Sequence, residues 1–387
     1  LSRWLRGGFA SRGGMGSRRM RAITSIDVAC VDLELIEPFS ISGGRASEAK
    51  IAVIRLVLAD GTVGLGEAAP FPAYDGQTRS ACLEALHQAA PNILGVDPIL
   101  SQQLNDRIME SAPGSSCALF ALEMAALDAF CKHEEIPLWR FLGAKDVPLV
   151  SDITIVAGDL DHAARCAEEA CRNGFRTLKI KVGRDDISLD RERLQVISAA
   201  APGCGLILDA NGGFSVEEAE QLMRISSTDG VEVKLYEQPV DALDEAGMAH
   251  LTSLEMWPIC ADESCRSGAD AMRIVERGIA DCINVKTQKS GYLETLKIIE
   301  IARAAGLSLM IGGMIESSLS MSFSAHLARG VGGFRHIDLD TPLFIRDHPF
   351  SGGIAIDGGT VTLNDDKPGH GVRIASDNLD WKLLAQE

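Results

Sequence analysis

The sequence predicts an α/β protein whose main unit is a TIM-type barrel, preceded by a separate α+β unit. From Leu149 onward, eight strand-like runs alternate with seven helix-like stretches. Such alternation is typical of parallel βα units, and eight of them favour a closed (β/α)7β barrel. A doubly wound open sheet is the alternative, but no G-x-G-x-x-G motif follows the first of these strands.

Residues 22–148 are predicted to form the α+β unit. Three β-rich runs occupy residues 22–70, and the Asp60-Gly61 pair between the second and the third is a strong hairpin signal. Residues 76–133 show helical apolar spacing, as in ACLEALHQAAPNIL and CALFALEMAALDAFCK. Because strands come first and helices follow, we expect a unit with its own core.

The barrel is predicted to span residues 149–345. Its strand-like runs are, in order, DITIV, KIKVG, LILDA, KLYEQ, ICADE, CINVK, LMIGG and HIDLD. Helical stretches such as HAARCAEEACRNG and LETLKIIEIARAAG separate them. In the closing segment, 346–387, the stretch GGIAIDGGTVTLNDD at 352–366 is predicted to be a hairpin that packs back on the N-terminal unit.

Charge and composition argue against several classes of protein. The 387-residue chain carries a net charge of −17, so we expect no extended nucleic-acid surface and no attraction to anionic membranes. No apolar run approaches the ~18 residues of a membrane span. Ten cysteines show neither a C-x-x-C pair nor zinc-type spacing. This favours a reducing compartment, and we expect a cytoplasmic protein.

The first 21 residues differ from the rest, with six arginines and no acids. Transit peptides have this composition. The favoured alternative is a non-native or over-extended start, with Met15 or Met20 as the initiator. Residues 1–21 are therefore predicted to be a non-structural extension.

Ionisable residues end six of the eight predicted strands. They are Lys181, Asp209, Glu237, Asp262, Lys286 and the pair Asp338 and Asp340. Functional residues of a barrel collect at the carboxyl ends of its strands. Each residue alone has the properties of an ordinary solvated charge, but the set together would converge into one cluster.

Three of these residues are carboxylates on adjacent strands, which suggests a metal site. Asp209, Glu237 and Asp262 offer only oxygen ligands, which suit Mg²⁺, or Mn²⁺ as its substitute, and not zinc. The alternative is neutralisation by nearby Lys and Arg. Three acids packed together without a cation would raise one another's pKa, so we favour the metal.

Two lysine-bearing strands bracket the three acids. Lys179 and Lys181 are two residues apart on one strand, so both side chains face the same side, here the barrel interior. Lysine is a poor base at neutral pH, but burial, a metal and a second lysine would each lower its pKa. Lys181 and Lys286 are therefore candidate bases on either side of the metal; a surface lysine is the alternative.

The motifs KIKVG, LDAN, YEQP, ADES and NVK, in this order, resemble the enolase superfamily, specifically its muconate-lactonising branch. The resemblance implies a barrel with one Mg²⁺ and an α+β capping domain built from the N-terminal region and the C-terminal tail. It implies that Asp209, Glu237 and Asp262 hold the metal, that Lys181 and Lys286 are the acid/base pair, and that Asn211 supports them. The implied reaction removes a proton α to a carboxylate and forms an enediolate. The mandelate-racemase branch has a His–Asp arrangement where this chain has Lys286.

The stretches MIGGMIESSLS and DLDT resemble the dipeptide epimerases. In that family the D-x-D pair, here Asp338 and Asp340, binds the ammonium group of the dipeptide. The resemblance adds Lys179, Met314 and Glu316 to the substrate-binding set. Arg45 lies where an arginine of Ala-Glu epimerases meets the glutamate side chain.

The chain departs from the Ala-Glu pattern at Gly212 and Tyr292. We therefore expect a Mg²⁺-dependent dipeptide epimerase, with the side-chain preference and a homo-oligomeric state left open. Alternatives are an o-succinylbenzoate synthase or N-succinylamino acid racemase, a cycloisomerase, and a non-catalytic barrel that binds a metal or peptide. Asp338 and Asp340 have their own alternative, pairing with Arg335 or Arg346.

Overall fold

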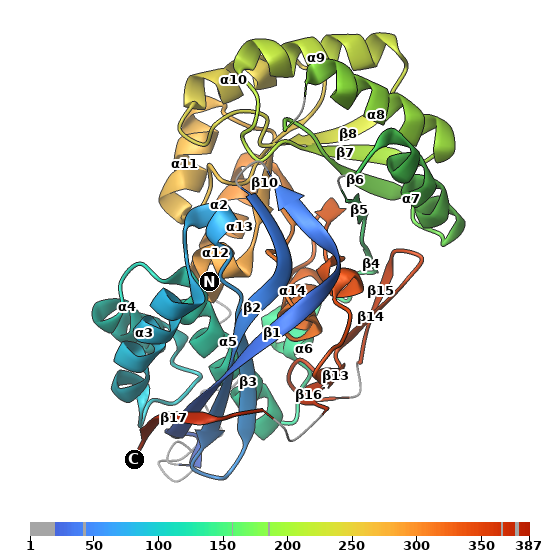
Figure 1. Cartoon of the computed structure of the whole chain (residues 1–387). Coiled ribbons are helices and arrows are strands. Elements are labelled where there is room, and N and C mark those ends of the chain that lie inside the picture. Colours follow the sequence, from blue (N-terminus) through green and yellow to red (C-terminus); the bar gives the residue numbers. More distant parts are fainter. Residues whose placement is uncertain (1–19, 42–43, 157, 185, 365–366, 376–378) are drawn as a thin grey trace.

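The computed structural model has two parts, a cap and a barrel (Figure 1). It describes residues 20–41, 44–156, 158–184, 186–364, 367–375 and 379–387. Residues 1–19, most of the predicted N-terminal extension, lie outside this range. Arg21, which we had assigned to the extension, contacts Asp97 and Glu134 at 2.9 and 2.8 Å, so the cap includes it.

The cap is built on a four-stranded antiparallel sheet with the strand order β17-β1-β2-β3. Its strands are β1 (Ile23–Ile41), β2 (Gly44–Leu58), β3 (Val63–Ala68) and β17 (Lys382–Gln386). The C-terminal strand β17 thus joins the N-terminal sheet, as the red ribbon beside β1 shows in Figure 1. A capping unit made from both ends of the chain is confirmed.

Helices follow the first three strands of this sheet. They are α2 (Pro72–Asp75), α3 (Arg79–Ala89), η1 (Ala90–Ile93), α4 (Ser101–Ser111), α5 (Ser116–His133) and α6 (Leu138–Leu142). Two of them, α3 and α5, pack against the sheet. The central helix α5 is buried along almost its whole length. It approaches β3 so closely that a Cβ atom on Gly64 or Gly66 would lie 2.0 Å from a carbonyl oxygen of α5, which is why glycine is needed there.

The barrel contains eight parallel strands in sequential order. They are β5 (Ile153–Ile155), β6 (Thr177–Lys181), β7 (Gly205–Asp209), β8 (Val233–Glu237), β9 (Ile259–Ala261), β10 (Cys282–Val285), β11 (Ser308–Ile311) and β12 (His336–Ile337). At the ends of this order, the backbone N–H of Asp152 donates to the carbonyl of Ile337 at 2.9 Å, which links β5 to β12. The predicted TIM-type fold is confirmed, and the open doubly wound sheet is not observed.

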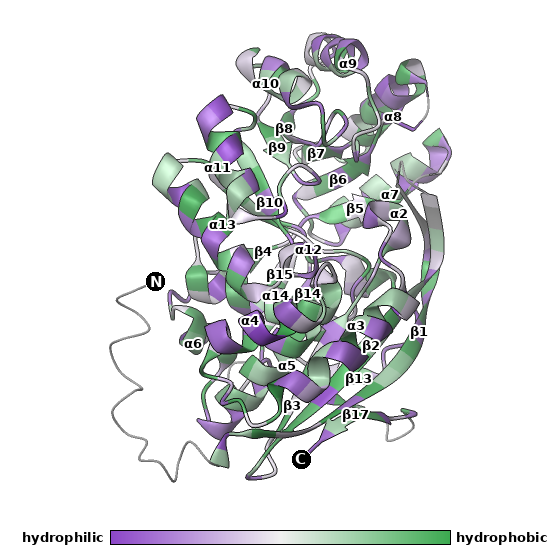
Figure 2. Cartoon of the chain, turned by 90° about the vertical axis from the view of Figure 1, so that its left-hand side faces the viewer, coloured by the Kyte–Doolittle hydropathy of each residue, from purple (hydrophilic) through white to green (hydrophobic). Residues whose placement is uncertain are grey.

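Helices connect the strands, and most of them cover the outside of the barrel. They are α7 (Leu160–Arg172), α8 (Ile187–Ala200), α9 (Val216–Thr228), α10 (Glu245–Ser253), α11 (Gly268–Arg277), α12 (Thr287–Ser290), α13 (Tyr292–Ala305) and α14 (Ser318–Val331). The short helix α12 is instead buried against α5 of the cap. Figure 2 shows mixed polar and apolar residues on outer helices such as α9. Inside the barrel, one apolar layer consists of Ile207, Leu235, Cys260, Cys282 and Met310. The next inward position on four of these strands is occupied by Asp209, Glu237, Asp262 and Asn284.

The closing segment differs from the prediction. The hairpin of β14 (Ile354–Asp357) and β15 (Thr360–Leu363) forms as expected, but β15 pairs with β4 (Leu149–Val150) at the entry to the barrel. It does not pair with the N-terminal sheet, which receives β17 instead. The segment also contains η2 (Thr341–Phe344), β13 (Phe350–Gly352) and β16 (Val372–Ile374).

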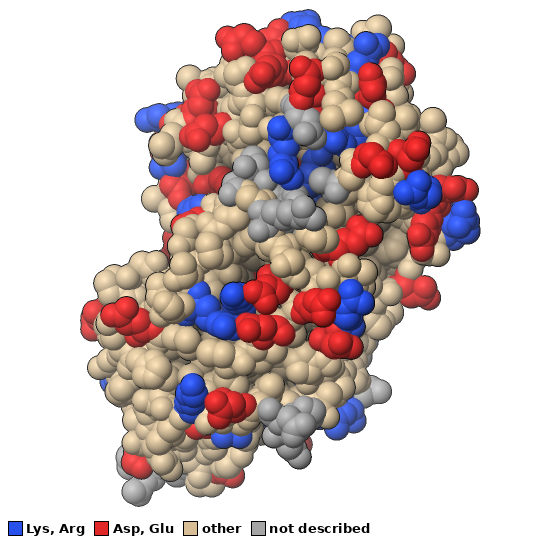
Figure 3. Space-filling model, viewed as in Figure 1, with Lys and Arg blue, Asp and Glu red and all other residues tan. Residues whose placement is uncertain are grey.

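Positive and negative side chains are interspersed on the face drawn in Figure 3. Within the described residues, no helix combines the length and the apolar character that crossing a bilayer requires.

Candidate active site

A pocket lies between the carboxyl ends of the barrel strands and the cap. It contains about 410 Å³ of space not filled by atoms, part of it open to solvent. Seven of the predicted site residues line it: Lys179, Lys181, Asn211, Lys286, Met314, Asp338 and Asp340. The structure therefore brings together residues that are far apart in the sequence.

The two candidate bases face each other across the barrel. Lys181 ends β6 and Lys286 follows β10, and these strands are four apart in the eight-strand order. Lys181 Nζ donates to Asp209 Oδ2 at 2.6 Å and to Asn211 Oδ1 at 3.1 Å. Lys286 Nζ donates to Asp262 Oδ2 at 2.6 Å. Each lysine is thus held by one of the predicted metal ligands.

Asn211 reaches Lys181 through an unusual backbone conformation. Its φ of 45° lies in the left-handed region, which asparagine tolerates better than most residues. The side chain then bridges two neighbours, because Oδ1 accepts from Lys181 and Nδ2 donates to Glu263 Oε1 at 3.0 Å. The predicted supporting role of Asn211 fits this geometry.

Lys179 contacts three carboxylates at once. Its Nζ lies 3.0 Å from Asp209, 2.8 Å from Glu237 and 2.7 Å from Asp338. The side chain is buried, and burial alone would lower its pKa, but these carboxylates raise the pKa well above its ordinary value. Lys179 therefore stays an ammonium that ties the metal candidates to the D-x-D pair.

The three predicted metal ligands lie side by side beneath the lysines. Lys181, Asp209 and Glu237 are in register across β6, β7 and β8, and Asp262 directly follows β9. All three carboxylates are buried. Burial and the nearby Asp209 raise the pKa of Glu237 to about 7. Burial also acts to raise the pKa of Asp262, but Lys286 and Lys289 hold it well below its usual range.

These acids fit a divalent ion. An oxygen-only donor set suits Mg²⁺ or Mn²⁺, and a buried glutamate with a raised pKa is stabilised by a cation beside it. Lysine ammonium groups lie between the carboxylates in the structure. The same acids raise the pKa of Lys286, although burial acts to lower it. Burial and Lys179 do act to lower the pKa of Lys286, as expected, but the neighbouring carboxylates outweigh them.

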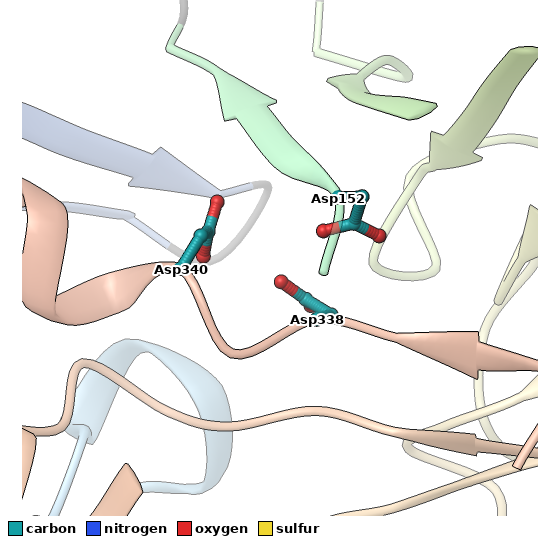
Figure 4. A group of neighbouring side chains, drawn as sticks. All are labelled: Asp152, Asp338 and Asp340. Carbon is teal, nitrogen blue, oxygen red and sulfur yellow. The ribbon is translucent and has the colours of Figure 1, made fainter. Parts of the chain in front are cut away.

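A second group of acids was only partly predicted. Within the described residues, Asp152, Asp338 and Asp340 form the one group of three whose carboxylate oxygens lie within 4.8 Å of one another. Figure 4 shows Asp152 just before β5, with its carboxylate toward the two acids that follow β12. Asp340 Oδ2 accepts from the backbone N–H of Thr154 at 2.6 Å. Pairing with Arg346 is not observed, because Arg346 contacts Glu34.

Two predicted binding residues are not observed on the pocket wall. Glu316 is fully buried behind it, where its carboxylate accepts from Met314 N at 2.7 Å and from Ser320 Oγ. Glu316 therefore holds the loop that carries Met314. The backbone of Arg45 pairs with Ser40 in the β1–β2 hairpin, and its side chain lies outside the described part of the structure. Gly212 and Tyr292 do not line the pocket.

The sequence interpretation missed residues on both sides of the pocket. Tyr74, from α2 of the cap, donates from its hydroxyl to Asp262 Oδ1 at 3.0 Å. On the barrel side, Lys289 Nζ lies 2.9 Å from the same oxygen. Lys289 follows Lys286 by three residues, and that spacing could have indicated that both lysines belong to the site. Nothing in the local sequence around Tyr74 indicated a contact with the barrel.

The fold and the site together define a barrel enzyme with paired lysines, buried acids and an α+β cap. Comparisons with known proteins agree with this class of protein. Residues 23–143 match the family model "Mandelate racemase / muconate lactonizing enzyme, N-terminal domain", and residues 162–378 match "Enolase C-terminal domain-like". The chain belongs to the enolase superfamily, in the group of mandelate racemase and muconate-lactonising enzymes.

Its relatives narrow the class further. The aromatic dipeptide epimerase of Herpetosiphon aurantiacus is 44% identical over 91% of this chain and 99% of its own length. A solved mandelate racemase/muconate lactonizing protein from the same organism superposes with a TM-score of 0.90 at 43% identity, covering 92% of this chain and 99% of that one. A dipeptide epimerase of Enterococcus faecalis, solved with Mg and L-Leu-L-Tyr, is 30% identical with a TM-score of 0.86, covering 91% and 99%. The predicted enzyme class, an isomerase of the epimerase type, is confirmed.

Proposed function

We propose that this chain is a Mg²⁺-dependent dipeptide epimerase that inverts the α-carbon of the C-terminal residue. One observation carries the proposal: Lys181 and Lys286 face each other across one pocket from strands four apart. A base on each side permits deprotonation of a carbon on one face and reprotonation on the other. A binding module has no need for the second lysine.

The substrate carboxylate is proposed to lie above Asp209, Glu237 and Asp262, which hold the divalent ion. The ion, Mg²⁺ or Mn²⁺, supplies positive charge that stabilises negative charge on carboxylate oxygens. With the α-carbon between the lysines, the neutral form of one lysine removes the α-proton to give an enediolate. The ammonium form of the other lysine delivers a proton to the opposite face, and the epimer results.

The N-terminal ammonium of the dipeptide is proposed to bind Asp338 and Asp340. Both acids line the pocket, and burial together with Asp338 raises the pKa of Asp340 to about 7. A cation near Asp340 is therefore favourable. An N-succinylamino acid has no ammonium group and would leave the buried Oδ1 of Asp340 without a partner, so the N-succinylamino acid racemase is the weaker alternative.

Named relatives support the same substrate class. The similar proteins from Herpetosiphon aurantiacus and Enterococcus faecalis are named an aromatic and a hydrophobic dipeptide epimerase. The Enterococcus structure contains Mg and a dipeptide, which supports Mg²⁺ as the ion here.

Incubation in D₂O with Mg²⁺ and a library of L,L-dipeptides tests the proposal. We expect deuterium at the C-terminal α-carbon, read by mass spectrometry, together with formation of the L,D epimer, read by chiral chromatography. EDTA-treated enzyme is the control for the metal. Exchange with N-succinylamino acids but with no dipeptide would favour the racemase, and no exchange with either set would contradict an epimerase altogether.

A further inference from the structure

Asp152 is a buried acid that lies behind the pocket wall. Among the described residues, Asp338 and Asp340 line the pocket and Asp152 does not. Asp152 is 2% exposed, and its carboxyl group faces the two acids that follow β12 (Figure 4). Oxygens of the three carboxyl groups lie within 4.8 Å of one another. A role of Asp152 in substrate binding would therefore pass through these two acids.

The three acids differ in the hydrogen-bond donors that they meet. Asp338 Oδ2 accepts from Lys179 Nζ at 2.7 Å, and Asp340 Oδ2 accepts from the backbone N–H of Thr154 at 2.6 Å. Neither oxygen of Asp152 has a hydrogen-bond donor among the residues that the structure describes. Because a buried carboxylate without a donor is costly, Asp152 is the acid of the three that is least able to carry a negative charge.

The charges around Asp152 lead to the same assignment. Burial first, and then Asp338 and Asp340, raise the pKa of Asp152 well above its ordinary value. Lys179 acts to lower this pKa, but its ammonium group is shared with two of the proposed metal ligands. Burial acts to raise the pKa of Asp338 too, yet Lys179 holds it below its ordinary value. Since close like charges disfavour joint ionisation, the proton of the group belongs on Asp152.

We propose that Asp152 is a positioning residue that holds a proton and donates it in a hydrogen bond to Asp338. This bond and the Lys179 contact together fix the Asp338 carboxylate. With Asp152 neutral, the group carries two negative charges, one facing Lys179 and one left for a substrate cation. The group then matches a single ammonium group, without a third charge that would force the acids apart. The inference rests on the proposed function, to which it adds a residue that does not touch the substrate.

Infrared difference spectroscopy tests the proton without any substrate. Protonated and ionised carboxyl groups absorb in separate bands, so the spectrum of Asp152→Asn minus that of the wild type shows which form is lost. Both proteins are measured at neutral pH with Mg²⁺ present. We expect loss of a protonated-carboxyl band and no change in the carboxylate bands. Loss of a carboxylate band, as for an ionised acid that binds a cation, would overturn the inference whatever the enzyme acts on.

Two variants of similar shape test the hydrogen bond during turnover. Asp152→Asn keeps a donor, since its Nδ2 can donate to Asp338, whereas Asp152→Leu has the same branching and no donor. Asp152→Leu should raise KM for a free L,L-dipeptide about 10-fold with little change in kcat. It should have little effect on the N-acetyl form, which has no ammonium group. Asp152→Asn should recover most of the loss in KM.

Two kinetic outcomes would contradict the assignment. Equal KM values in Asp152→Asn and Asp152→Leu would show that the hydrogen bond from residue 152 has no part in binding. An equal effect of Asp152→Leu on the free and the N-acetyl dipeptide would show a general loss of structure in place of a role at the ammonium group. If the wild type turned over no dipeptide, the proposed function would fail, and the infrared spectra would still decide whether Asp152 holds the proton.

Discussion

Replacing Glu67 by glutamine is expected to remove a pH dependence from the contact between cap and barrel. Glu67 lies in β3 of the cap and is fully buried. Its Oε1 accepts from the backbone N–H of Ser317 at 2.9 Å and its Oε2 accepts from the Ser317 hydroxyl. Burial, and to a smaller extent Glu316, raise the pKa of Glu67 from 4.5 to about 7, although both bonds from Ser317 act to lower it.

The sign follows from the higher pKa of the folded state. Well below pH 4.5, Glu67 is protonated in both the folded and the unfolded chain, so its ionisation does not affect the free energy of unfolding. As the pH rises to about 7, Glu67 ionises in the unfolded chain but stays largely protonated in the folded chain, so the free energy of unfolding falls. At about 1.4 kcal/mol per pH unit, this loss is on the order of 3 kcal/mol and is complete above about pH 7.

Urea denaturation followed by circular dichroism measures the effect. At about pH 5, Glu67→Gln should be near wild type in stability, since the glutamine carbonyl oxygen can accept from the Ser317 N–H and its Nε2 can donate to the Ser317 hydroxyl oxygen. At about pH 8, it should gain on the order of 3 kcal/mol relative to wild type. The control Glu48→Gln, on an exposed position of β2, should change stability by less than about 0.5 kcal/mol at either pH. A difference between Glu67→Gln and wild type that is the same at both pH values would refute the reasoning.

Three predictions concern the site. Lys181→Ala and Lys286→Ala should each abolish epimerisation. Each variant should still exchange the α-proton of one epimer, and the two variants should act on opposite epimers, as measured by deuterium uptake from L,L- and L,D-dipeptides. Full activity in both variants would exclude the two-base mechanism. Glu237→Gln should weaken Mn²⁺ binding at least about 10-fold in an EPR titration, while Asp152→Asn leaves the binding unchanged. The reverse result would place the metal at Asp152, Asp338 and Asp340 instead. Asp338→Asn should raise KM at least about 10-fold for a free dipeptide and little for its N-acetyl form; an equal change in both would argue against an ammonium contact.

Much of the barrel and its central chemistry could be predicted from the sequence. The alternation of strands and helices fixed eight parallel strands, and parallel strands in a barrel place their carboxyl ends on one face. Lys181, Lys286, Asp338 and Asp340 could therefore be assigned to one pocket without knowing any contact between them. Each residue's position along its own strand was enough.

The missed residues depend on packing that no local pattern reports. Tyr74 reaches Asp262 only because a separate unit docks on the barrel. Asp152 precedes its strand, and it joins Asp338 because closure of the barrel aligns the start of β5 with the end of β12. The hairpin at 354–363 was recognisable from its turn, but its partner β4 was too short, at two residues, to be recognised as a strand.

The balance of charge in the site favours the proposed dipeptide substrate over a free amino acid. Burial, and after it the neighbouring acids, raise the pKa of four carboxyl groups in the site: Glu237, Glu263, Asp340 and Asp152. Glu237 is itself a proposed metal ligand and Glu263 directly follows another, Asp262. Asp340 and Asp152 lie beside Asp338, which contacts Lys179. The site therefore lacks positive charge in two separate places. A dipeptide carries its ammonium group one residue away from the reacting carbon, so in the proposed binding mode it would supply positive charge at Asp340 while its carboxylate lies toward the proposed metal site at Glu237. A free amino acid carries the ammonium group on the reacting carbon itself.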